Sequence, residues 1–391
     1  MLASEASSRA GTACWVSASL LAIACSGLLP APSAARGTAG STAKPHPVPS
    51  AEERVDEIFS DFDAESSPGA AVIVVRDGAV LFQGAYGEAD LRQGTLIETD
   101  TVFHLASVGK QMTAVAILQL VEKGKLALDD PAAKYLPELS GWADKVTIRH
   151  LLLHTGGLPD VYEALEERAG ASGQRPGPEP DNAAALKLLA QWKRLDFQPG
   201  ARQDYSNTGY DALGALIQKV SGQSFGAYMQ EHIFAPAGMK DTFAWDTARR
   251  ARSKHARGYA WDEDHWTLDD ESPLNLIHGS GSISSTVEDM ARYDKALFGH
   301  KLLKESSLGE ILKPGRLADG QTIPYGFGWD IDRNEENGAL YDGHSGAWMG
   351  FSSYYLHYPQ AKLSVIVLSN SSETEAEALA FETAEVFLAP L

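Results

Sequence analysis

The sequence predicts an α/β fold in which one antiparallel sheet is flanked by N- and C-terminal helices and carries an inserted, mostly helical domain. Residues 70–86 have the pattern of a β-hairpin, and strand-rich segments return only after residue 325. The region between them is mainly helical and loop-like. Strands at both ends of a chain, with helices between them, are typical of a sheet assembled from two distant segments.

Composition and charge limit the classes of function. The chain has 391 residues, 44% of them hydrophobic, and a net charge of -19. These values are typical of a globular protein, and the acidity argues against a nucleic-acid partner, which requires clustered Lys and Arg. The two cysteines, Cys14 and Cys25, lie near the N-terminus, and no H-E-x-x-H motif occurs. We therefore expect no metal site and no cofactor.

The N-terminal residues predict export. Arg9 precedes an apolar stretch over residues 13–30 that is short and interrupted by serines, which is typical of a signal peptide. We expect a signal peptide over residues 1–24, a flexible linker over 25–50 and a periplasmic or secreted protein. The residues before Cys25 fit a cleavage site, but they also resemble a bacterial lipoprotein box in which Cys25 carries a membrane anchor. Both interpretations remain open.

The folded domain is predicted over residues 51–391. An amphipathic helix over residues 51–62 comes first, followed by strands at 70–75 and 79–86 joined by Asp77-Gly78, a strong hairpin signal. The expected helical subdomain covers about residues 125–275. The remaining elements are helices at 150–154, 186–192, 210–220 and 375–387, and strands at 325–330, 347–358 and 363–369. The Gly/Pro-rich segment 169–180 either borders an active site or is a surface insertion.

Ser107 and Lys110 form the candidate nucleophilic pair. They lie at the start of an apolar helix, where residues three apart are neighbours and the helix N-terminus favours negative charge. Burial lowers the pKa of a lysine, so a neutral Lys110 can accept the Ser107 proton. The pattern alone is weak, because Ser107 also fits a helix cap and Ser41 and Lys44 repeat the spacing.

Two later motifs add candidate residues. Tyr205 lies in a loop, where a tyrosine beside a cationic amine has its phenolate favoured and can act as a base or relay. Asn207 offers donors and an acceptor to an amide-bearing substrate. His344 is a further candidate catalytic residue. Gly346, two residues later, allows a ligand to approach the strand closely, and the N–H groups of Ala347 and Ser107 are a candidate oxyanion hole. Capping turns are the alternative interpretation of both motifs.

Three other segments are weaker candidates. The pattern G-x-S-x-G occurs around Ser224, but it follows a helix rather than a strand, so Ser224 is expected to cap the next helix. His154 has the same His-x-Gly spacing as His344 and is expected to end a helix. We expect the loop 277–281 near the cleft, and Ser285 with Glu288 fits a capping box.

Ser107-Val108-Gly109-Lys110, Tyr205-Ser206-Asn207 and His344-Ser345-Gly346, in this order and spacing, resemble the three motifs of the serine β-lactamase and penicillin-binding-protein superfamily. The branch with class C β-lactamases, D-alanyl-D-alanine carboxypeptidases and esterases is the most similar. The resemblance runs from about residue 51 to the C-terminus and extends to the surrounding segments 101–103, 124–130, 147–158 and 325–329.

This resemblance implies a β-lactamase/transpeptidase-like α/β sandwich with the site between it and the helical domain. It implies a serine hydrolase with an acyl-enzyme on Ser107, and either Lys110 or Tyr205 as the acylation base. Its substrate would be a small-molecule ester, an amide, or a D-amino-acid peptide such as one derived from peptidoglycan. Class C β-lactamases usually carry lysine in place of His344, which is mostly neutral at pH 7, and this favours a carboxypeptidase or esterase. The alternatives are a β-lactamase proper and a non-catalytic sensor or binding module.

Overall fold

The computed structural model describes residues 49–63, 66–170, 179–245, 250, 254–270, 272–335 and 337–388. Within it, Pro49–Leu391 forms one compact unit. The predicted signal peptide, nearly all of the linker, both cysteines, Ser41 and Lys44 lie outside the described residues, as does most of the 169–180 segment. None of the helices in the described ranges combines the length and the apolar character that a membrane span requires.

The central sheet has six strands in the order β12-β13-β14-β15-β1-β2, all antiparallel to their neighbours. Its strands are β1 (Ala70–Arg76), β2 (Ala79–Tyr86), β12 (Asp330–Arg333), β13 (Leu340–Trp348), β14 (Phe351–Tyr358) and β15 (Leu363–Ser369). In the middle of the sheet β1 pairs with β15, so that Ala70 lies opposite Ser369. This pairing confirms that one sheet is built from both ends of the folded domain.

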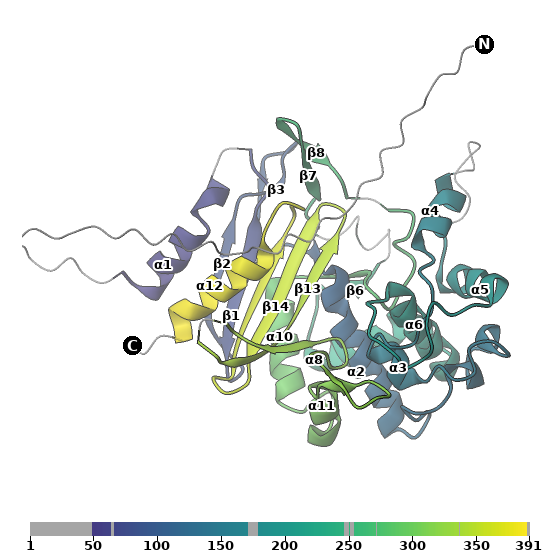
Figure 1. The fold of residues 1–391 in the computed structure, drawn as a ribbon. Coiled ribbons are helices and arrows are strands. Elements are labelled where there is room, and N and C mark those ends of the chain that lie inside the picture. Colours follow the sequence, from purple (N-terminus) through teal and green to yellow (C-terminus); the bar gives the residue numbers. More distant parts are fainter. Residues whose placement is uncertain are drawn as a thin grey trace, which may run out of the picture. The chain divides into compact units, whose positions relative to one another are not determined.

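The two faces of the sheet bury different layers of helices. Side chains of a strand alternate between faces, so residues 71, 73 and 75 of β1 join one hydrophobic cluster and residues 70, 72 and 74 join another. The second cluster includes α1 (Ala51–Ile58) and α12 (Ala376–Leu388), which cover one face of the sheet in Figure 1. On the other face lie α10 (Val287–Phe298) and the helical part of the molecule.

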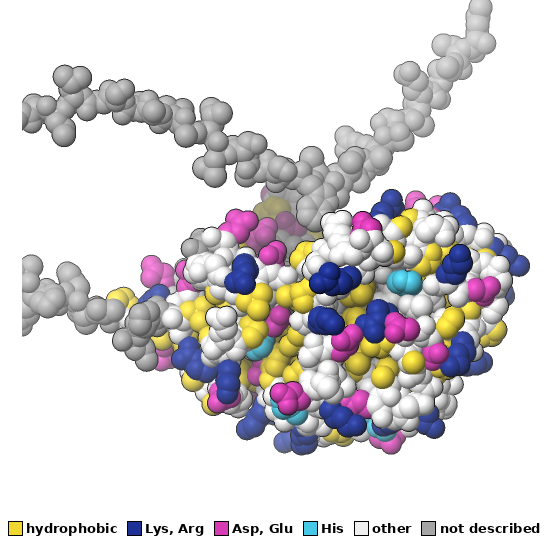
Figure 2. All heavy atoms as spheres, turned by 60° about the horizontal axis from the view of Figure 1, so that its bottom comes forward, with side chains coloured by type: hydrophobic (Ala, Val, Ile, Leu, Met, Phe, Trp, Pro, Cys, Tyr) yellow, Lys and Arg dark blue, Asp and Glu magenta, His cyan; other side chains and the backbone are white. Residues whose placement is uncertain are grey.

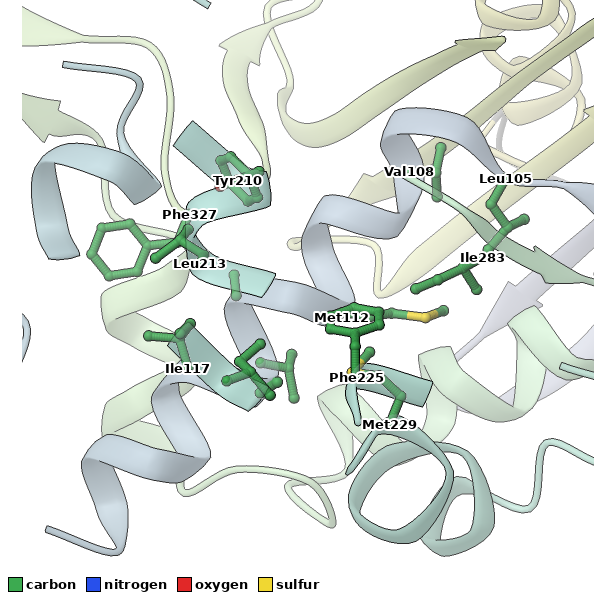
Figure 3. Packing of buried hydrophobic residues seen from close by; sticks show 14 of the residues in the cluster. Leu105, Val108, Met112, Ile117, Tyr210, Leu213, Phe225, Met229, Ile283 and Phe327 are labelled. Atoms are coloured by element: carbon green, nitrogen blue, oxygen red, sulfur yellow. The ribbon is translucent and has the colours of Figure 1, made fainter. Parts of the chain in front are cut away.

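Helix α2 (Gly109–Glu122) is buried on nearly all sides. Figure 3 shows Met112 and Ile117 of this helix surrounded by apolar side chains of other segments. These come partly from α6 (Asn207–Ser221) and α7 (Phe225–Met229). A helix that is apolar all round is stable only where neighbours cover every face. The predicted buried helix behind Ser107 is therefore confirmed.

Short elements complete the fold. The remaining α-helices of the described residues are α3 (Ile148–Leu152), α4 (Tyr162–Gly170), α5 (Asn182–Trp192), α8 (Ala235–Ala237) and α11 (Glu305–Ile311). The small strands are β3 (Glu88–Asp90), β4 (Thr95–Leu96), β5 (Phe103–His104), β6 (Phe243–Ala244), β7 (Tyr259–Asp262), β8 (His265–Leu268), β9 (Ile283–Ser285), β10 (Gly315–Arg316) and β11 (Thr322–Ile323). On the face shown in Figure 2, basic and acidic side chains are interspersed rather than separated by sign.

The structure corrects three local predictions. The segment predicted as one strand over 347–358 is a hairpin, because Met349 has φ of 49° and turns the chain between β13 and β14. Tyr325 and Asp330 form only an isolated bridge around a turn, and the strand begins at Asp330. Helix α10 is capped by Thr286, whose side chain accepts from the Asp289 N–H, so the N-cap lies one residue later than predicted and is a single side-chain cap rather than the predicted capping box. Ser224 caps α7 as expected.

Candidate active site

Ser107 lies in a tight turn between β5 and α2. The turn is a 3-10 segment, Ala106–Val108, and Ala106 has φ of 48°, an uncommon conformation for alanine. Two hydrogen bonds hold it: the Leu105 N–H donates to Ile283 O at 2.8 Å, and the Ala106 N–H donates to His104 Nδ1 at 3.0 Å. The extended segment and the helix thus present Ser107 at the head of α2.

The Lys110 amine is surrounded by oxygen atoms. Its Nζ lies 2.9 Å from Ser107 Oγ, 2.8 Å from Asn207 Oδ1 and 2.7 Å from Ser280 O. The last two oxygens accept hydrogen bonds but cannot donate them. When Lys110 is neutral, its two N–H groups are therefore used by Asn207 and Ser280, and the lone pair is left for the Ser107 hydroxyl. This arrangement suits removal of the serine proton.

Burial sets the charge of the amine. Lys110 is 0% exposed, and this desolvation lowers its pKa from 10.5 to about 7, although the nearby Asp211 partly opposes the shift. Asp211 is itself buried, which raises its pKa to about 7. Its Oδ1 accepts from the Ser280 N–H at 3.3 Å, while its Oδ2 has no hydrogen-bond partner among the described residues. The two groups form a buried pair within one network.

Tyr205 lies beside the pair but differs from the expectation of a stabilised phenolate. Its side chain is half-exposed, its hydroxyl contacts Ser107, and Lys110 Nζ lies 4.8 Å from its ring centroid. The loss of hydration raises the pKa of Tyr205 more than the Ser107 contact lowers it. The phenol is therefore neutral near pH 7, and the amine faces the ring rather than the oxygen.

Asn207 and residues of the strand β13 complete the lining of the site around Ser107. Asn207 is the first residue of α6, and its amide oxygen is used by Lys110, which leaves its NH₂ group for a substrate. Ala347 lines a pocket together with Ser107 and Asn207. Gly346 packs against the nucleophile turn: a Cβ atom there would lie 2.4 Å from Leu105 O. The lack of a side chain at Gly346 therefore allows β13 to contact the turn that carries Ser107.

His344 is buried and belongs to a chain of hydrogen bonds. Its Nε2 lies 3.0 Å from the Tyr325 hydroxyl, which lies 3.0 Å from His154 Nε2. The other ring nitrogens meet the backbone: His344 Nδ1 is 2.6 Å from Ser345 O, and His154 Nδ1 accepts from the Ser206 N–H at 3.0 Å. Desolvation first, and then the charge of Lys110, lowers the pKa of His344 to about 3. His344 is therefore neutral.

Sequence reasoning placed the main motifs but missed several neighbours. His154, expected only to end a helix, packs against Tyr205 with 4.4 Å between the ring centroids and an angle of 30° between the ring planes. Ser280 was expected near the cleft without a chemical role, yet its carbonyl binds Lys110, and its Oγ lies 2.8 Å from Tyr162 Oη. Tyr325 and His154 lie in segments that carried the family resemblance, which was the available signal. Asp211 gave no signal, since a lone acidic residue in a helix is normally exposed.

Known proteins share this fold and much of the sequence. The beta-lactamase family model matches residues 55–387. Penicillin-binding protein 4* of Bacillus subtilis (strain 168) is 32% identical over 354 residues, 86% of this chain and 76% of that protein. D-aminopeptidase of Brucella anthropi is 30% identical over 333 residues, 82% of this chain but only 59% of that enzyme. The octameric penicillin-binding protein homologue from Pyrococcus abyssi has a TM-score of 0.74 and 27% identity, covering 86% of this chain and 76% of that one.

The fold and these similarities define a serine hydrolase with the β-lactamase architecture. The chain belongs to the beta-lactamase family, in the neighbourhood of penicillin-binding proteins and D-aminopeptidases. The expected resemblance and the expected α/β fold are confirmed. The chain spans less than two thirds of the length of the D-aminopeptidase.

Proposed function

We propose that this protein hydrolyses an ester or amide through an acyl-enzyme on Ser107. The observation that carries the proposal is the 2.9 Å contact between Ser107 Oγ and the fully buried amine of Lys110. Neutral Lys110 takes the hydroxyl proton while Oγ bonds to the acyl carbon, and the leaving group departs with a proton supplied from Lys110 or Tyr205. Water then cleaves the acyl-enzyme and restores both residues.

The oxyanion hole belongs to the same proposal. The N–H groups of Ser107 and Ala347 are assigned to the developing oxyanion, because these two residues line one pocket. Asn207 is assigned to the amide of the substrate through its free NH₂ group. Gly346 supports the hole by allowing β13 to lie against the nucleophile turn.

The charge of the pocket indicates the substrate class. In the described part of the chain, the residues that line it together with Ser107 include no arginine and no lysine. By the family resemblance, His344 stands at the position where class C β-lactamases carry lysine, a fixed cation for a substrate carboxylate, and the low pKa of His344 keeps it neutral. The site thus favours substrates without a carboxylate next to the scissile bond, such as D-amino-acid amides, N-terminal D-residues of peptides and simple esters. An efficient β-lactamase fits less well, and so does the carboxypeptidase that the family resemblance favours, because a carboxypeptidase cleaves next to a terminal carboxylate.

Export remains part of the proposal. It rests on the sequence of residues 1–24, and a lipid on Cys25 is the alternative to a free mature N-terminus. The same location would give the enzyme peptidoglycan-derived peptides as substrates.

A labelling experiment tests the nucleophile. A fluorophosphonate probe should label the wild-type protein recovered from expressing cells and leave Ser107→Ala unlabelled, and the intact mass of the labelled chain also reports cleavage after residue 24 and any lipid. A substrate panel should show hydrolysis of p-nitrophenyl esters and D-alanine amides to be faster than that of nitrocefin or a D-Ala-D-Ala peptide. Equal labelling of both proteins excludes Ser107 as the nucleophile.

The dependence of kcat/KM on pH should follow the protonation of the Lys110 amine. Because only the neutral amine accepts a proton and its pKa is about 7, kcat/KM should rise with pH through about 7 and be lost below it. Asp211→Asn removes a negative charge that favours protonated Lys110, so the acid limb should move to lower pH. A pH-rate profile of both proteins measures this. An unchanged limb in the variant would show that Lys110 does not titrate there.

A further inference from the structure

A series of hydrogen bonds runs from the Ser206 N–H through His154, Tyr325 and His344 to Ser345 O. When both histidines are neutral, only one assignment of donors and acceptors is consistent along it. The Ser206 N–H donates to His154 Nδ1, so the proton of the His154 ring is on Nε2 and is donated to Tyr325. Ser345 O can only accept, so the His344 ring carries its proton on Nδ1. His344 Nε2 then has a free lone pair and must accept from the Tyr325 hydroxyl.

This series of hydrogen bonds links the loop before α6 to the strand β13, which lie on two sides of the site. Its first donor is the backbone between Tyr205 and Asn207, and its last acceptor is the backbone next to Gly346. The three side chains in this series of hydrogen bonds are nearly inaccessible to solvent: His154 is 1% exposed, His344 2% and Tyr325 3%. The loop before α6 and the strand β13 are thereby joined across a gap that no direct backbone pairing spans among the described strands.

We propose that Tyr325 is a positioning residue, which accepts from His154 and donates to His344 and so holds the Tyr205 loop and the β13 strand in register around Ser107. It touches no substrate in this role. The proposal rests on the hydrolytic function above for its effect on rate, but the proton positions that it requires are properties of the resting protein and can be measured without turnover.

An imidazolium does not fit this arrangement. A proton added to His154 Nδ1 would face the Ser206 N–H, and one added to His344 Nε2 would force the hydroxyl proton of Tyr325 to turn away, toward the Tyr210 hydroxyl. The titratable side chains around the two rings are Lys110 from α2, Tyr205 before α6, Tyr210 in α6 and Tyr325 before β12. One carboxyl lies near them: Asp330 of β12 pairs with Gly343, the residue before His344, and burial raises the pKa of Asp330 to about 7, so it supplies little negative charge at pH 6.

Nitrogen-15 NMR of histidine-labelled protein tests the proton positions. In the wild type at pH 6, His344 should be neutral with its proton on Nδ1, and His154 neutral with its proton on Nε2. Signals are assigned by their loss in His344→Asn and His154→Asn. An imidazolium at either position, or the opposite tautomer, overturns the proposal, and this result needs no variant of Tyr325 to fold.

Tyr325→Phe tests the positioning effect. It should lower kcat by about tenfold or more with a smaller change in KM, because misplaced groups slow the chemical step. It should also raise the pH at which His344 protonates, since the lone pair on Nε2 loses its donor. Tyr228→Phe is the matched control, because Tyr228 is equally buried and its hydroxyl donates to Gln119 Oε1 in another part of the core. An unchanged kcat, or an equal loss in both variants with unchanged histidine signals, overturns the proposal; a wild-type protein that hydrolyses nothing overturns the proposed function instead.

Discussion

Replacement of Lys110 by methionine is expected to lower kcat/KM by about three orders of magnitude. A positioned general base contributes about 10²–10⁴-fold, and Lys110 Nζ is the basic atom in contact with the Ser107 hydroxyl. Methionine has a similar length and suits the apolar surroundings of α2, so the side chain volume is kept. Steady-state kinetics on a p-nitrophenyl ester measure the loss.

The stability of Lys110→Met should change much less than its activity. The substitution leaves Asn207 Oδ1 and Ser280 O without their donor, but it also removes a buried amine whose lowered pKa shows that burial disfavours its charge. Lys187→Met is the matched control, because Lys187 lies on the exposed surface of α5. Retention of more than a tenth of the wild-type kcat/KM by Lys110→Met would assign the base to another group.

Gly346→Ala is the second variant with a large expected effect. The new Cβ would lie 2.3 Å from Ser353 Oγ and 2.4 Å from Leu105 O, and the second of these is backbone of the nucleophile turn. Overpacking of this kind costs about 1–3 kcal/mol of unfolding free energy. Because β13 or the turn must move, the two oxyanion donors separate, and kcat/KM should fall by about 10²-fold. Thermal unfolding and ester hydrolysis measure the two effects.

Gly309→Ala provides the control for a bare glycine-to-alanine change. Gly309 lies within α11, its Cβ would meet nothing within 4 Å, and alanine should stabilise this helix by about 0.5–1 kcal/mol. Its activity should stay at the wild-type level. If Gly346→Ala behaves like Gly309→Ala in both measurements, the close approach of β13 to the turn is not required for catalysis.

Local patterns accounted for much of the fold. The Asp77-Gly78 pair predicted the hairpin because both residues adopt positive φ there, at 49° and 74°. The apolar run after Ser107 predicted a buried helix, since no face of it could be left in water. The hairpin at Met349 was missed because methionine in a left-handed conformation gives no turn signal.

The sequence by itself determined which residues are available for chemistry: a serine and a lysine one helical turn apart, and a tyrosine and a histidine in two distant motifs. Only the tertiary structure decided their charge states. The neutral Tyr205 and His344, and the pKa values of about 7 for Lys110 and Asp211, follow from desolvation by segments far away in the chain. The link from His154 to Tyr325 spans 171 positions. Propensity acts over a few neighbouring residues, whereas hydration and hydrogen-bond direction depend on what the whole fold packs around a group.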